Sequence, residues 1–105
     1  MASEATIRAV TECLSRAAPD ATIILFGSHA RGEAREDSDI DILVVEPVVR
    51  SRHEEIVRLT EEVGDLDVPT DIIVVSTAIY HEWAEEHGTV IHEAWREGRV
   101  LHAPA

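Results

Sequence analysis

Three short apolar runs constrain the fold of this chain more than any other feature. They are ATIILFG at 21–27, DIDILVVE at 39–46 and DVPTDIIVVS at 67–76, and each is rich in β-branched residues. Runs of this length, bounded by turn-forming residues, are typical of buried strands. Segments with helical spacing of apolar residues separate them. The predicted order is therefore αβαβαβα, and the predicted class is α/β with helices packed on a small sheet.

The segments before and between these runs carry the signals of helices. Ser3 is a predicted N-cap for a helix that ends before Pro19. A short polar helix is predicted over 28–36 and a longer one over 51–64, with its apolar residues on one face.

The C-terminal part is also predicted to be largely helical. Thr77 and Thr89 are the predicted caps of two helices, which Gly88 separates. Helical spacing directs one face of this pair into the core, namely Ile79, Tyr80, Trp83, Val90, Ile91, Ala94 and Trp95. Either tryptophan could instead anchor a partner helix, because tryptophan is favoured at the centres of interfaces. Residues 99–103 are predicted to be extended.

Length and charge limit the class of protein. A chain of 105 residues is expected to form one domain, 1–105. No apolar run approaches the roughly 20 residues that span a bilayer, and a single cysteine excludes an internal disulfide. We therefore expect a cytoplasmic protein that does not bind a membrane. The formal net charge of −12 argues against direct binding of a nucleic-acid backbone and favours a cation or a basic partner.

Acidic residues occur at the start of two predicted strands. Asp39 and Asp41 share one face of a strand, with Cα atoms roughly 6.7 Å apart, while Ile40 points into the core. Two such carboxylates repel each other unless a cation lies between them, and a site of oxygen ligands alone favours Mg²⁺ or Mn²⁺. Asp71 opens the next run and completes a three-carboxylate site if the two strands are adjacent. Taken alone, Asp71 is better explained as a turn or edge residue, and only the three acids together favour a site.

A Gly-Ser turn precedes the two aspartates. Gly27 lets the chain turn and lets an anion approach, and Ser28 offers a hydroxyl and a backbone N–H. The turn is not a Walker A loop, because the chain contains no lysine. Arg31 is either a phosphate contact or the partner of Asp37 or Asp39 in a salt bridge. His29 is either a phosphate contact or a turn residue without a further role.

These residues carry a resemblance to a known family. GSHARGEAREDSDID at 27–41 has Gly-Ser, ten residues and Asp-x-Asp, the signature of the DNA polymerase β-like nucleotidyltransferase superfamily. Its Ala-Arg-Gly, together with GTVIHEAWREGRVLH at 88–102, resembles the minimal nucleotidyltransferase (MNT) branch. The resemblance implies a mixed sheet with helices on one side. It implies nucleotide contacts at Gly27, Ser28 and Arg31, and catalytic metal ligands at Asp39, Asp41 and Asp71.

The resemblance also implies a partner and a reaction. Larger relatives add a domain for the acceptor, and none is recognisable here, so we expect a partner protein or an oligomer. MNT proteins are paired with HEPN-domain ribonuclease toxins, which implies an Mg²⁺-dependent antitoxin that transfers AMP from ATP to a toxin tyrosine and releases pyrophosphate. Two alternatives stay open. The protein could neutralise the toxin by binding alone, or it could be a small-molecule nucleotidyltransferase of the aminoglycoside type.

Overall fold

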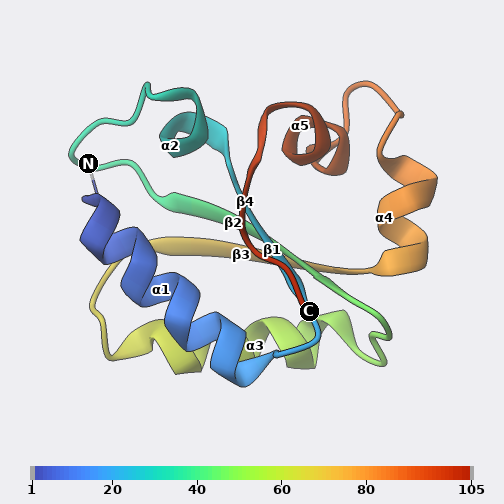
Figure 1. Cartoon of the computed structure of the whole chain (residues 1–105), viewed down its shortest axis with the longest axis horizontal. Coiled ribbons are helices and arrows are strands. Elements are labelled where there is room, and N and C mark those ends of the chain that lie inside the picture. The colour runs from blue at the N-terminus through green and yellow to red at the C-terminus, as the bar shows by residue number, and fades with distance from the viewer. Residues whose placement is uncertain (1, 105) are drawn as a thin grey trace.

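The computed structural model describes residues 2–104 and has helices on both sides of one sheet (Figure 1). Its elements follow in the order α1 (Glu4–Ala17), β1 (Thr22–Phe26), α2 (Gly27–Arg31), β2 (Ile40–Glu46), α3 (Arg52–Gly64), β3 (Thr70–Ser76), α4 (Thr77–Trp83), α5 (Val90–Glu97) and β4 (Arg99–His102). The three predicted strands and the mixed α/β class are confirmed. The second helix is shorter than the predicted 28–36, because Gly32 adopts a left-handed conformation and ends it.

The sheet is mixed, with the strand order β3-β2-β1-β4. β2 and β3 are parallel, whereas β1 is antiparallel to both of its neighbours. β4 extends the predicted order by a fourth strand. It has only four residues, and Arg99 and Val100 are exposed, so the segment lacks the apolar run that marks a buried strand.

Two apolar layers lie against the two faces of the sheet. Ile40 and Ile42 of β2 belong to the layer beneath α1 and α3, whereas Leu43 and Val45 belong to the layer beside α5. Figure 1 shows α1 and α3 on one side of the sheet and α2, α4 and α5 on the other. The expectation of helices on one side only was therefore wrong, because the second face carries short helices of its own.

Serine and threonine side chains cap α1, α3, α4 and α5, and Ser3 and Thr89 are the caps that were predicted. Ser3, Ser51 and Thr89 accept hydrogen bonds of 3.1, 3.2 and 3.0 Å from backbone N–H groups three residues later. Ser76, rather than the predicted Thr77, caps α4. Among the described residues, no helix has the length and apolar character needed to cross a bilayer.

The burial predicted for the C-terminal helices is only partly confirmed. Ala94 is buried, and Ile91 packs against the second apolar layer. Trp83, Val90 and Trp95 were predicted to point inward but are 42%, 45% and 48% exposed. Short helices bury only a narrow stripe, and here Ala94 is the one buried residue of α5, while α4 has none.

At the end of β2, Glu46 lies beside Glu55 of α3, whose carboxylate accepts two bonds of 2.7 and 2.8 Å from Arg58. Burial, followed by the neighbouring Glu55, raises the pKa of Glu46 to about 7. The hydrogen bonds from Arg58 and then from Glu46 lower the pKa of Glu55. One oxygen of Glu46 is buried without a hydrogen-bond partner. A proton on Glu46 lets it donate to Glu55.

We expect Glu46→Gln to remove a pH dependence of stability. The pKa of Glu46 is about 7 in the folded state and 4.5 otherwise, so the folded state holds this proton more tightly. The free energy of unfolding of the wild type therefore falls as pH rises from about 4.5 to about 7, and the glutamine variant loses most of that fall. Urea unfolding at pH 5 and pH 8 measures this difference. Glu61→Gln, an exposed acid on the same helix, is the control, and an unchanged pH slope in Glu46→Gln would contradict the account.

Candidate active site

The strand register brings the predicted acids and the Gly-Ser turn to one edge of the sheet. Asp41 of β2 lies opposite Phe26 of β1 on one side and opposite Asp71 of β3 on the other. Phe26 is the last residue of β1, and Gly27 follows it directly. The adjacency of the second and third strands, on which the three-carboxylate hypothesis depended, is confirmed.

The acidic side chains differ in exposure. Ile40 and Ile42 are fully buried in the layer under α1 and α3, so alternation places Asp41 on the opposite face, with Leu43. Asp41 is half-buried, whereas Asp39 and Asp71 are exposed. Asp39 lies just before β2 rather than within it, which differs from the predicted strand over 39–46.

Asp41 has the most perturbed environment of the three acids. Burial raises the pKa of its carboxyl above the ordinary 3.8, and the charges of Asp71, Asp39 and Glu93 raise it further, while His29 lowers it. Such an acidic cluster is electrostatically unfavourable without a cation, and its oxygen ligands suit Mg²⁺ or Mn²⁺. Within residues 2–104, however, no three potential ligand side chains are already arranged to hold a metal ion. Like-charged carboxylates repel one another, and a bound cation removes that repulsion.

Gly27 allows the turn to lie directly against Asp41. It has a φ of +73°, and a Cβ built at this position would collide with the Asp41 carboxylate. Any other residue there would both strain the backbone and displace the acid. Ser28, which follows, is half-buried at the start of α2. The turn and the acids therefore form one continuous surface.

Arg31 is held by acids, but not by the two that were predicted. Its guanidinium lies 3.3 Å from Glu33, 3.7 Å from Glu93 and 3.5 Å from Glu97. The expected alternative, a salt bridge to Asp37 or Asp39, was wrong because α5 packs beside α2 and brings its own acids to Arg31. Arg31 stays a predicted nucleotide contact.

We expect Arg31→Ala to raise the KM for the nucleotide about tenfold with little change in kcat, because a phosphate contact that is equally strong in the ground state and the transition state contributes to binding alone. Steady-state kinetics at varied nucleotide concentration measure the two constants. A lowered kcat with an unchanged KM would show instead that Arg31 acts by holding α5 in place.

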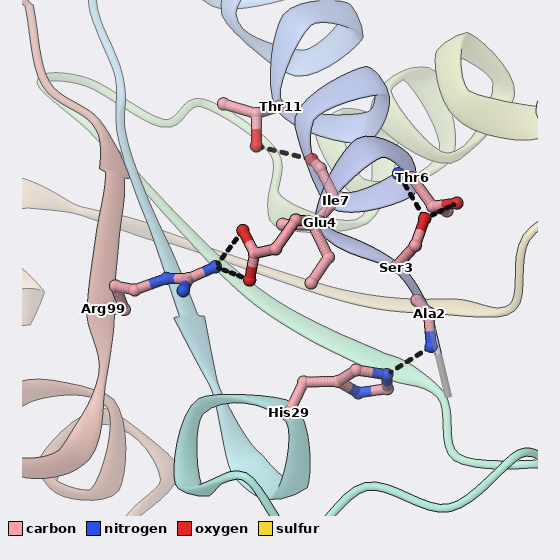
Figure 2. Close-up of polar contacts among 8 residues, drawn as sticks. All are labelled: Ala2, Ser3, Glu4, Thr6, Ile7, Thr11, His29 and Arg99. Carbon is pink, nitrogen blue, oxygen red and sulfur yellow. Dashed lines mark hydrogen bonds and ion pairs between the residues drawn. The ribbon is translucent and has the colours of Figure 1, made fainter.

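His29 connects the turn to the start of the chain. Its Nε2 accepts a 3.2 Å hydrogen bond from the backbone N–H of Ala2, and Figure 2 shows the ring pointing toward that residue. Its Nδ1 is buried and has no hydrogen-bond partner. Figure 2 also shows Arg99 of β4 paired with Glu4 of α1, at 3.2 Å. The interpretation of His29 as a turn residue without a further role was thus incomplete, since its partner lies 27 positions away.

Glu93 is the residue of this site that the sequence did not reveal. It lies on α5, raises the pKa of Asp41 and pairs with Arg31. No local pattern marks it, because its proximity to Asp41 depends on the packing of α5 against β1 and α2.

The site thus contains a half-buried acid between two exposed acids, beside a glycine turn that could admit a phosphate. Such an arrangement is suited to metal-assisted transfer of nucleotides.

The comparison with protein families agrees with this class of site. The chain belongs to the nucleotidyltransferase domain family, whose model matches residues 7–102. No curated protein matches the sequence closely enough to count as a relative.

Several solved structures share the fold. A candidate nucleotidyltransferase from Sulfolobus solfataricus has a TM-score of 0.66 at 18% identity, over 94% of this chain and 78% of its own. A toxin–antitoxin structure with AMP-PNP has a TM-score of 0.56 at 24% identity, over 91% and 73%. A tri-AMPylated Shewanella oneidensis HEPN toxin in complex with an MNT antitoxin has a TM-score of 0.55 at 20% identity, over 95% and 71%. At these identities the likeness establishes the fold.

Proposed function

We propose that this protein is an Mg²⁺-dependent antitoxin of the MNT branch that transfers AMP from ATP to a hydroxyl group, most simply of a tyrosine, on a HEPN-domain toxin. One observation carries the proposal. Asp41 lies in register with Asp71 on one side and, on the other, with the residue before Gly27-Ser28. The acids and the turn that nucleotidyl transfer requires therefore lie side by side at one edge of the sheet.

In the proposed reaction the acceptor oxygen attacks the α-phosphorus of ATP. The new O–P bond forms as the bond to the β-phosphate oxygen breaks, and pyrophosphate leaves. Asp71, which is exposed, takes the hydroxyl proton, and Ser28 and the adjacent backbone N–H groups bind the triphosphate. Mg²⁺ or Mn²⁺ held by Asp39, Asp41 and Asp71 would supply charge stabilisation at the phosphates.

The choice of acceptor rests on the structures that share the fold. One contains a toxin–antitoxin pair with AMP-PNP, and another a HEPN toxin carrying AMP groups beside an MNT antitoxin. In a further MntA–HpeT complex, two aspartates are replaced with glutamate. The net charge of −12 also suits a basic partner, since complementary charge speeds association.

A second function, neutralisation by binding alone, is favoured by one observation. The net charge of −12 suits association with a basic partner whether or not transfer occurs. Co-expression with the cognate HEPN toxin, sought first among the genes next to that of this protein, separates the two functions. If transfer neutralises the toxin, Asp39→Ala combined with Asp41→Ala abolishes rescue of growth and the toxin carries no AMP. Full rescue by the double variant would establish neutralisation by binding and would contradict the proposal.

A further inference from the structure

A groove lined mainly by apolar side chains lies between α4, α5 and β3. Its volume is about 780 Å³, within the range that takes a few large side chains. Ile73, Val75 and Ile91 line it and pack into the second apolar layer of the protein. Ile79, Trp83 and Val90 also line the groove and are exposed by 40–45%. These are among the side chains that were expected in the core.

The groove lies on the β3 side of the carboxylates. Ile73 follows Asp71 by two positions on β3, so the two side chains share a face of the sheet. The Gly27-Ser28 turn lies on the other side, because the strand order is β3-β2-β1 and the turn follows β1. From Ile73 the groove continues along β3 to Ser76 and then to Trp83 of α4, so it extends toward the end of β3 that is away from Asp71. Arg50 and Arg52 follow the end of β2, which is likewise the end away from Asp41. A segment bound in the groove reaches Asp71 when its chain continues along β3 past Ile73.

Two arginines are among the residues that line this groove. Arg50 and Arg52 both line it and are exposed, and neither takes part in an ion pair among residues 2–104. In a chain with 21 acidic and nine basic residues, two neighbouring arginines without an acidic partner form a local positive site. An occupant of the groove is thus expected to carry a carboxylate beside its apolar side chains.

We propose that this groove docks the segment of the HEPN partner that carries the acceptor hydroxyl, with large apolar side chains against Trp83 and an acidic residue at Arg50 and Arg52. The proposal rests on the proposed function and adds the route by which the acceptor enters. Docking there anchors the segment, and the chain next to this anchor runs along β3 past Ile73 to bring the hydroxyl to Asp71. A second copy of this chain is a poorer occupant, since two copies of net charge −12 repel each other.

Two tryptophans of similar exposure make a matched pair of variants. Trp83 lies in the groove, whereas Trp95, on α5, lines a separate hollow with His92 and Arg96. The full chain is tested with the cognate HEPN toxin as acceptor. We expect Trp83→Ser to raise the KM for that protein at least tenfold, with kcat and the Kd of AMP-PNP unchanged. Trp95→Ser should stay within about twofold of wild type. Arg50→Glu combined with Arg52→Glu should also raise KM, and more strongly at low salt.

The experiment distinguishes a failure of the docking proposal from a failure of the proposed function. If Asp41→Asn abolishes transfer but Trp83→Ser leaves KM unchanged, the docking proposal is wrong and the proposed function stands. If wild-type protein transfers nothing to the HEPN protein, the proposed function fails, and docking is then judged by calorimetric binding of the same protein. Binding that Trp83→Ser does not weaken, or the absence of any binding, contradicts it. Conversion of a dimer to a monomer by Trp83→Ser, measured by light scattering, would assign the groove to a second copy and also contradict it.

Discussion

Asp41→Asn is expected to lower the rate of nucleotidyl transfer by at least about 10³-fold while the protein stays folded. The substitution keeps the shape of the side chain but removes the charge at the centre of the acidic cluster. Loss of a ligand to the catalytic cation removes several kcal/mol of transition-state stabilisation, and about 4 kcal/mol corresponds to 10³ in rate. Single-turnover transfer of labelled AMP to the acceptor measures the effect.

The same variant should be more stable than wild type at neutral pH. Burial and the charges of Asp71, Asp39 and Glu93 raise the pKa of Asp41, so its ionised form is less favourable in the folded protein. The free energy of unfolding of the wild type therefore falls as pH rises from the ordinary pKa of 3.8 through the raised pKa of Asp41. The Asp41→Asn variant lacks this titrating group, so its stability does not fall for this reason. Melting temperatures at pH 3 and pH 7 with chelator present test this. Asp37→Asn, an exposed neighbour, is the control, and a variant that is both inactive and destabilised would contradict the account.

Gly27→Ala is expected to lower transfer at least about 100-fold and to destabilise the fold. Alanine at a φ of +73° costs about 1–2 kcal/mol, and its Cβ meets the Asp41 carboxylate. Because that carboxylate must then move, the site loses the placement on which transfer depends, and a displacement of about 1 Å can cost 10² in rate.

Gly32→Ala is the matched control for this prediction. Gly32 has the same φ of +73°, but a Cβ there meets nothing within 4 Å. It should cost the same backbone strain and leave transfer within about threefold of wild type. Denaturant unfolding and transfer assays on both variants separate strain from the collision with Asp41. Equal loss of transfer in the two variants would show that the turn matters only for stability.

The elements that local pattern determines could be predicted from the sequence. β1, β2 and β3 follow from β-branched runs, and the N-caps Ser3 and Thr89 follow from their side chains. Alternation along β2 placed Ile40 in the core and Asp41 on the other face. The site itself required one further assumption, the pairing of β2 with β3, which no local pattern establishes.

The parts that were missed depend on contacts distant in the sequence. β4 is a strand because it pairs with β1, not because its residues form an apolar run. Arg31 meets Glu93 and Glu97 through the packing of α2 against α5, and His29 meets Ala2 through the start of α1. Trp83 is exposed because α4 is short, although its spacing is that of a core residue.

Position-specific labelling of ATP tests the central claim most directly. The wild-type protein is incubated with its HEPN partner, Mg²⁺ and ATP labelled at either the α- or the γ-phosphate, and the acceptor is analysed by mass spectrometry. We predict that label from the α-phosphate alone reaches the HEPN protein, that pyrophosphate appears in equal amount, and that Asp41→Asn abolishes both. Transfer of the γ-label, or α-labelling that survives in Asp41→Asn, would contradict a nucleotidyltransferase site built on Asp39, Asp41 and Asp71.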